Sequence, residues 1–417
     1  KSNVFGSSGT VAAAAGGLSW QSVVTASTVT VESNKGYFVN TTSNACTVTL
    51  PASPDVGDQV ILLDYARTWD TNAITIDSNG NNFQGEEDSY IVDYDTEGQG
   101  INIVYSGSTN GWIPNSDIAN ALTPVAPVTQ RALFAFGSTG SLTSVKNLVN
   151  SSGVVASDVT GVGTARYGLA ASSYGGDKAI FAYGYTSGYV SMSNLVNNSG
   201  VVAADVSGVG SARSGLGSSA YGGDKAIFGF GSTGSYVSLT NLVNASGVIG
   251  ADVTGVGTAR FGITATEYGG DKGIFGFGFT AAENLTGVTN LISNSGVVAS
   301  DVSAVGTARR YAAAAPYGGD KGIFAYGNTS GGGNVSMSNL VSNSGVVASD
   351  VSGVGTAREG SNATNYGGDK AIFGFGNSGS VTGVTNLVNN SGVIAADVSA
   401  VGTARDSLAA AGYSYSA

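Results

Sequence analysis

Histidine is absent from this 417-residue chain, and cysteine occurs only once. The lack of histidine excludes Ser-His-Asp triads, histidine-based acid–base catalysis and the common zinc and copper sites. A single cysteine also excludes an intrachain disulfide and a metal site built from several cysteines. The composition therefore indicates a protein that is not an enzyme, and we expect no catalytic residue, no metal ligand and no cofactor.

Charge and long apolar runs are also scarce. Charged residues make up 11% of the chain, and the 17 basic and 28 acidic residues give a net charge of −11. Binding to nucleic acid is not expected, because it depends on Lys and Arg to neutralise phosphates. Membrane insertion is not expected either, since no apolar run approaches the roughly 18 residues that a spanning helix needs. The chain begins with Lys1 rather than Met, so we expect it to be processed or a portion of a longer product.

Six copies of one repeat occupy the rest of the chain after residue 130. The tripeptide Thr/Ser-Ala-Arg recurs at spacings of 47, 47, 49, 49 and 47 residues. An aspartate precedes each arginine by eight positions, and Tyr-Gly-Gly-Asp-Lys occurs five times, first at Tyr174–Lys178. The repeated arginines are Arg166, Arg213, Arg260, Arg309, Arg358 and Arg405.

Each repeat predicts short β-strands and no helix. In one unit the candidate strands are Ala226–Gly231, Leu239–Asn244, Val248–Val253 and the run after Arg260. Gly, Asn and Ser separate these runs at intervals of about 8 to 12 residues, as in all-β repeats. Four strands in a repeat of this length are typical of a β-propeller blade. The fold class is therefore predicted to be all-β.

The repeats resemble kelch repeats. Each has an aromatic strand ending in Phe-Gly or Tyr-Gly, an Asn-containing third strand, and a downstream Arg followed in most copies by small residues. The double glycine and the tryptophan of the kelch family are missing. The resemblance covers residues 131–417 and implies a kelch-like β-propeller.

The two ends of the repeat region complement each other. It opens with Arg131–Gly137, a second strand without its first, and finishes with Leu408–Tyr413, a first strand without its second. Pairing the two would remove an open sheet edge that could recruit other chains. We therefore predict that the last strand, about Leu408–Tyr415, pairs with Ala132–Gly137 to close a ring of six blades.

Residues 1–130 differ from the repeats. They contain 13 acidic and three basic residues, and thus most of the negative charge. Cys46 lies in an alternating stretch with Val48 and Leu50, which predicts a buried thiol on a strand. Three of the six prolines, Pro114, Pro124 and Pro127, indicate a linker. The strands expected before the linker are 37–41, 47–50, 59–65, 73–77, 90–93 and 101–105.

The order of short motifs in this segment is similar to that of a module in bacteriophage tail-fibre and related virion proteins, particularly those of cyanobacterial and marine phages. The motifs are Gly36–Asn40, Val48–Pro51 with Gly57-Asp58, Ile74–Ile76 with Asn79-Gly80, and Val104-Tyr105 with Gly111-Trp112. The resemblance implies a homotrimer at the virion surface that attaches to other virion proteins through its N-terminal region. The expected organisation is an attachment segment 1–19, a fibre-type β domain 20–115, a linker 116–130 and a six-bladed propeller 131–417.

Variation between the repeats indicates a candidate binding surface. The residue after the repeated arginine is Tyr167, Ser214, Phe261, Arg310, Glu359 or Asp406. The loop between the second and third strands also varies, whereas the other turns hardly change. In an up-and-down blade both variable positions lie on one face. The varying loop residues are Tyr185 and Tyr189, Tyr236, Phe279 and Glu283, and Asn334.

Exposed aromatic side chains beside Asn, Ser and Thr suit stacking on sugars and hydrogen bonds to hydroxyl groups. Neutral drift at tolerant loops explains the same variation. The candidate ligand-binding residues are Tyr167, Phe261, Arg310, Glu359 and Asp406. The repeated Asp and Arg are expected to support each blade instead, because they occur in every copy.

Two classes of function are left open. The first is a phage tail fibre or related surface fibre whose propeller binds the host surface, with a glycan as the expected receptor. The second is an extracellular bacterial lectin or adhesin. A glycosidase ranks third, because the sequence locates no pair of carboxylates in a cleft.

Overall fold

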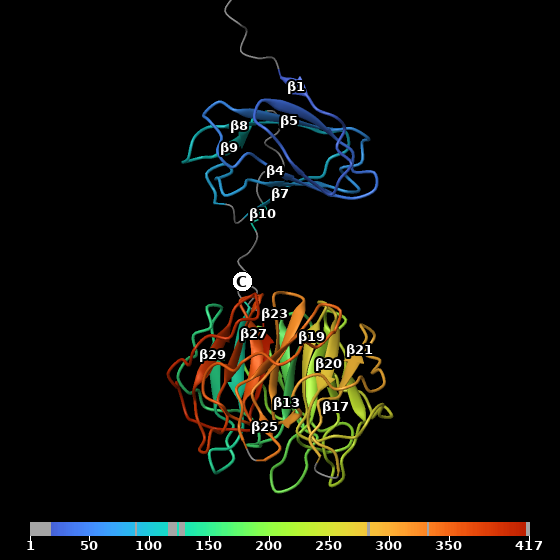
Figure 1. Ribbon diagram of the computed structural model, residues 1–417, viewed down its shortest axis with the longest axis vertical. Coiled ribbons are helices and arrows are strands. Elements are labelled where there is room, and N and C mark those ends of the chain that lie inside the picture. The colour runs from blue at the N-terminus through green and yellow to red at the C-terminus, as the bar shows by residue number, and fades with distance from the viewer. Residues whose placement is uncertain are drawn as a thin grey trace, which may run out of the picture. The chain divides into compact units, whose positions relative to one another are not determined.

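The computed structural model describes residues 18–87, 90–115, 123–124, 130–281, 284–331 and 333–413 (Figure 1). Every regular element in these ranges is a β-strand, which confirms the predicted all-β class. No helix in the described ranges could therefore cross a membrane. The chain divides into an N-terminal unit, residues 1–127, and a C-terminal unit, residues 128–417. Most of the expected attachment segment and linker lies outside the described residues.

The N-terminal unit consists of two five-stranded sheets that form two layers (Figure 1). One sheet has the order β1-β3-β5-β8-β9, and the other has the order β10-β7-β6-β4-β2. The strands are β1 (Ser19–Trp20), β2 (Thr28–Thr30), β3 (Lys35–Val39), β4 (Cys46–Thr49), β5 (Gln59–Asp64), β6 (Ile74–Asp77), β7 (Tyr90–Tyr94), β8 (Gly100–Tyr105), β9 (Trp112–Pro114) and β10 (Thr123–Pro124).

Alternation of apolar and polar residues builds this unit. In β4 the side chains of Cys46 and Val48 are buried, whereas those of the two threonines are partly exposed. Cys46 and Val48 pack with Val60 and Ile103 of the other sheet in one hydrophobic core. The predicted burial of Cys46 is confirmed, and burial raises the pKa of its thiol.

The C-terminal unit contains six three-stranded antiparallel sheets, one for each repeat (Figure 1). Their first strands are β30 (Ala409–Tyr413), β13 (Ala170–Tyr174), β16 (Gly217–Tyr221), β19 (Thr264–Tyr268), β23 (Ala313–Tyr317) and β27 (Asn362–Tyr366). The middle strands are β11 (Arg131–Ala135), β14 (Lys178–Ala182), β17 (Lys225–Gly229), β20 (Lys272–Gly276), β24 (Lys321–Ala325) and β28 (Lys370–Gly374). The third strands are β12 (Lys146–Val149), β15 (Ser193–Val196), β18 (Thr240–Val243), β21 (Thr289–Ile292), β26 (Ser338–Val341) and β29 (Thr385–Val388). Two further short strands, β22 (Arg309–Arg310) and β25 (Asn328–Thr329), pair with each other.

The middle strands are buried on both faces. Ile227 and Phe228 of β17, adjacent in sequence, point to opposite faces and are both fully buried. Ile227 packs in one hydrophobic cluster and Phe228 in another, so each middle strand supplies apolar contacts to both sides of its sheet. A continuous apolar run of this kind is typical of a strand buried on both faces.

The prediction of four strands per repeat is wrong in one respect. The expected outer strand Val248–Val253 makes only two isolated bridges to β18, Ile249 with Val243 and Val253 with Thr240. Between the two bridges, three residues of the outer segment (250–252) therefore face two of β18 (241–242), and one extra residue interrupts the ladder as in a β-bulge. The Asn241 side chain fills the interruption by donating to Gly250 O at 3.0 Å and Asp252 Oδ1 at 2.9 Å.

The predicted pairing of the two ends of the repeat region is confirmed. β30 pairs antiparallel with β11, with Arg131 opposite Tyr413 and Ala135 opposite Ala409. The first strands of neighbouring sheets also contact one another in a complete cycle, from β13 through β16, β19, β23, β27 and β30 back to β13.

A closed ring of backbone hydrogen bonds lies beside these first strands. Gly215 N donates to Gly168 O at 2.8 Å, and Gly168 N donates to Ser407 O at 2.9 Å. The equivalent hydrogen bond occurs in every repeat, and the bond from Ser407 N to Gly360 O completes the ring. The six members, which we call the collar, are Gly168, Gly215, Gly262, Tyr311, Gly360 and Ser407.

Candidate functional site

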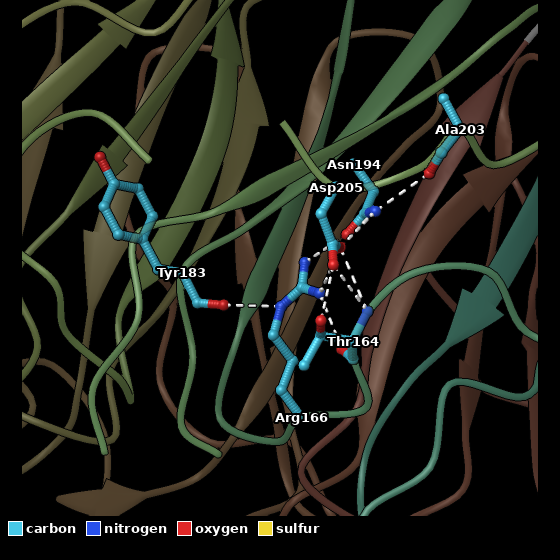
Figure 2. A network of polar contacts seen from close by, with 6 residues as sticks. All are labelled: Thr164, Arg166, Tyr183, Asn194, Ala203 and Asp205. Carbon is cyan, nitrogen blue, oxygen red and sulfur yellow. Dashed lines mark hydrogen bonds and ion pairs between the residues drawn. The ribbon is translucent and has the colours of Figure 1, made fainter. Parts of the chain in front are cut away.

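A network around a buried arginine connects the parts of each sheet (Figure 2). The Arg166 side chain is fully buried and donates from Nε to Tyr183 O at 2.9 Å and from Nη2 to Asn194 Oδ1 at 2.7 Å. Its guanidinium lies over the ring of Phe136 in the preceding sheet, 4.3 Å from the ring centroid. One side chain therefore contacts two neighbouring sheets.

An aspartate completes the network. Asp205 accepts hydrogen bonds from Thr164 Oγ1 at 2.6 Å and from Asn194 Nδ2 at 2.9 Å, and lies 3.9 Å from Arg166 Nη1 (Figure 2). The partner of each arginine is thus the aspartate of the following repeat rather than the one eight residues earlier. Burial lowers the pKa of Arg166 to about 10, and the charge of Asp205 opposes that shift. These contacts agree with the supporting role expected for the repeated pair.

The predicted site residues follow the buried arginines directly, and each forms a bridge with the variable loop of its own sheet. Tyr167 pairs with Tyr185, Phe261 with Phe279, and Glu359 with Asn377. Asp406 pairs with Ser138, and Arg310 with Asn328. The two variable positions of each repeat are therefore neighbours, as expected. Of the variable loop residues, Glu283 lies outside the described residues.

A cavity of about 260 Å³ brings four of the five candidates together. Tyr167, Phe261, Glu359 and Asp406 line it, together with all six collar residues. We call it the rim cavity. Arg310 is not part of its lining; the next residue, Tyr311, takes that place.

Aromatic side chains gather on one side of the rim cavity. Phe261 stacks on Tyr236 with 5.7 Å between ring centroids, and meets Tyr311 edge-on at 6.1 Å. Tyr167 packs against Tyr185 at 5.6 Å. Burial raises the pKa of Tyr311 to about 12, so its hydroxyl stays protonated at neutral pH.

Carboxylates occupy another part of the lining. Asn377 Nδ2 donates to Asp406 Oδ2 at 3.2 Å, and Arg310 Nε lies 4.0 Å from Glu359 Oε2. Burial raises the pKa of Glu359, with Arg310 opposing the shift and Asp406 adding to it. Beside them Ser361 is 5% exposed, and its hydroxyl has no hydrogen-bond partner.

Sequence reasoning missed Tyr311 and Ser361. The available signal was departure from the repeat: Tyr311 stands where four other copies have glycine, and Ser361 stands where the others have Leu, Ile or Ala. Tyr311 adopts a φ of 50°, a left-handed conformation that favours glycine. Tyr311 thus keeps the backbone conformation of the glycines at the equivalent positions, such as Gly262 with a φ of 64°.

A second cavity of about 100 Å³ is lined by the first strands and shares Leu169, Leu216 and Ile263 with the rim cavity. We call it the channel cavity. Glu267 of β19 contributes to its lining, and burial, helped by the charge of Asp271, raises the pKa of this carboxyl to about 7. The equivalent residues of the other repeats are uncharged.

The described residues contain no group of three His, Cys, Asp or Glu side chains arranged to bind a metal ion. Comparison with known proteins found no family model that matches the chain and no curated protein that matches it.

Proposed function

We propose that the C-terminal unit is a six-bladed, kelch-like β-propeller in which each three-stranded sheet is one blade. The pairing of β30 with β11, the cycle of contacts between first strands and the closed ring of collar hydrogen bonds support this architecture. A closed ring leaves no first strand without neighbours, as propellers require.

The chain serves as a non-enzymatic surface fibre, a phage tail fibre or related virion protein, whose propeller binds a carbohydrate on the host surface. The observation that carries this proposal is the rim cavity, which combines aromatic faces with Glu359, Asp406 and an unpaired Ser361 hydroxyl. Aromatic faces stack on the apolar face of a sugar, and a few polar groups fix its orientation.

The size of the rim cavity agrees with such a ligand. Its volume of about 260 Å³ lies just below the roughly 300–1,000 Å³ typical of pockets for drug-sized molecules, as suits a smaller ligand. A terminal sugar of a surface polysaccharide is a ligand of this scale.

A glycan array probed with the full chain and with Tyr167→Ser tests the binding role. Serine occupies the equivalent position at Ser214, so this change should not disturb folding. Loss of a stacking ring should weaken binding by about 1 to 3 kcal/mol. Tyr65→Ser is the matched control, because Tyr65 is 56% exposed in the N-terminal unit. Failure of the full chain to bind any glycan would contradict the proposal.

The fibre role implies a homotrimer assembled through the N-terminal region. Light scattering on the full chain and on residues 128–417 tests this. A trimeric full chain and a monomeric fragment support the fibre. A monomeric full chain that still binds a glycan would favour the alternative of an extracellular lectin or adhesin.

A further inference from the structure

The rim cavity has a chemical asymmetry that restricts its ligand. The charged residues in or beside it are Glu359, Asp406 and Arg310. Arg310 lies beside Glu359, whereas the hydrogen bond that Asp406 receives comes from the uncharged amide of Asn377. The three residues together leave one unbalanced negative charge at the cavity.

The buried arginines nearby do not cancel this charge. Arg405, directly before Asp406, donates to Thr403 O at 3.0 Å, while Thr403 binds Asp158. Each of the six arginines has an aspartate of this kind in its own network, so these networks are neutral as a set. The unbalanced charge belongs to the rim cavity itself.

A neutral sugar would leave this charge without a partner. Removing a carboxylate from water costs free energy unless an opposite charge or hydrogen-bond donors replace the water. A ligand with an ammonium group can provide both, because each of its N–H bonds can donate to a carboxylate. The aromatic part of the lining favours the same group, since cations are attracted to aromatic faces.

From this asymmetry, and resting on the proposed carbohydrate-binding role, we propose that the rim cavity selects an amino sugar with a free ammonium group. Its apolar ring face packs on Phe261 and Tyr311, and its ammonium lies between Asp406 and Glu359. The unpaired Ser361 hydroxyl supplies one further hydrogen bond to the ligand.

Titration calorimetry with the full chain tests the proposal. The probes are glucosamine oligomers and N-acetylglucosamine oligomers of the same length and linkage, which differ at the nitrogen: a charged ammonium in the first and an uncharged, larger acetamide in the second. The free amine should bind roughly ten- to hundredfold more tightly, the value of one charge-assisted hydrogen bond. Equal or tighter binding of the acetylated oligomer would overturn the inference while leaving carbohydrate binding intact. Failure of every glycan to bind would instead contradict the proposed function.

Variants locate the effect. Asp406→Asn keeps the shape of the side chain and should abolish the preference for the free amine without preventing folding. Asp224→Asn is the control, since Asp224 pairs with Lys225 in a Gly-Gly-Asp-Lys turn and lines neither cavity. If both Asp406→Asn and Glu359→Gln kept the preference for the free amine, the placement of the ammonium between these two residues would be overturned. Displacement of the oligomer by tetramethylammonium at equal concentration would show that the cavity binds the cation alone, and would overturn the proposal that its ligand is an amino sugar.

Discussion

Thr403 Oγ1 donates a hydrogen bond to Asp158 Oδ2 at 2.6 Å, although 245 residues separate them in the chain. Thr403 lies two residues before the buried Arg405, which precedes β30. Asp158 follows β12, the third strand of the same sheet. The same contact joins Thr164 to Asp205 and Ser211 to Asp252 at 2.6 Å, each across only 41 residues. The contact that connects the ends of the repeat region is therefore chemically the same as those within it.

This equivalence predicts how much each aspartate stabilises the fold. Asp158→Ala and Asp252→Ala should each lower the free energy of unfolding by about 1 to 3 kcal/mol. Each change leaves a backbone N–H, a hydroxyl and an asparagine amide without this acceptor, and removes the negative charge near a buried arginine. Urea denaturation measures both losses, with Asp224→Ala as the control. A loss for Asp252→Ala and none for Asp158→Ala would mean that the two ends do not associate in solution.

The aspartates also predict sensitivity to acid. Burial opposes the charge of Asp158, but hydrogen bonds from Thr403 and Asn147 and the charge of Arg405 outweigh it and lower its pKa. The other five behave alike. Carboxyls with a lower pKa in the folded state stabilise it above the pKa of the unfolded chain, roughly 3.9, and this stabilisation is lost as pH falls through the folded value. Unfolding free energy should therefore decline below about pH 4, and less steeply in Asp158→Ala.

Ring closure can be tested by moving the chain ends. Arg131 pairs with Tyr413 in the same way as Lys178 pairs with Tyr174 in another repeat. Gln130 also takes the place of the aspartate in the Gly-Gly-Asp-Lys turns: its carbonyl accepts a hydrogen bond from Gly367 N, as the carbonyl of Asp224 does from Gly175 N. Two glycines inserted between Tyr413 and Gln130 would thus recreate a turn of the same length as Tyr-Gly-Gly-Asp-Lys, with Gln130 and Arg131 in the places of Asp and Lys. A permutant of the C-terminal unit that carries this junction and opens between residues 176 and 177 should fold.

Its circular dichroism spectrum should match that of residues 128–417, with a Tm within a few degrees. The control joins Tyr413 directly to Gln130, which leaves a single residue for a connection that normally needs at least two. The control should be much less stable. Aggregation of the two-glycine permutant would contradict closure by β30 and β11.

Periodicity alone was sufficient to predict three strands of each repeat, the six repeat units and the pairing of β30 with β11, because strand patterns and half-repeats are local features of the sequence. It also led to the five candidate residues after the arginines, four of which line the rim cavity. The interrupted outer strand was not predictable from apolar spacing, since it depends on the Asn241 side chain replacing backbone contacts. Tyr311 and Ser361 were missed because they form a site only together with residues of other repeats, such as Phe261 beside Tyr311.

Glu267 predicts a second pH effect, of opposite sign. Its folded pKa of about 7 exceeds its ordinary value of 4.5. A carboxyl with a raised pKa destabilises the fold when it is ionised, so this cost is absent below about pH 4.5, grows as pH rises and is complete above about pH 7. Glu267→Gln should raise the unfolding free energy at pH 8 by an amount on the order of 2 to 3 kcal/mol and have little effect at pH 4.5. Equal effects of Glu267→Gln at the two pH values, measured by urea denaturation, would contradict the raised pKa.

The collar predicts that alanine destabilises the fold more at Gly215 than at Gly176, although the two glycines have similar backbone conformations. Gly215 has a φ of 62° and Gly176 a φ of 77°, so alanine at either position is strained by roughly 1 kcal/mol. A Cβ on Gly215 would also lie 2.2 Å from Cε2 of Phe261, whereas a Cβ on Gly176 would meet nothing within 4 Å. Gly215→Ala should therefore lower the unfolding free energy by about 1 to 3 kcal/mol more than Gly176→Ala.

The same pair separates stability from binding. The clash at residue 215 displaces the Phe261 ring from the rim cavity, so Gly215→Ala should weaken glycan binding even where the protein is fully folded. Gly176 belongs to a Gly-Gly-Asp-Lys turn and lines neither cavity, so Gly176→Ala should bind like the parent protein. Titration calorimetry at a temperature well below both unfolding transitions measures the two affinities. Weaker binding by Gly176→Ala with normal binding by Gly215→Ala would place the ligand at the turns and refute the assignment to the rim cavity.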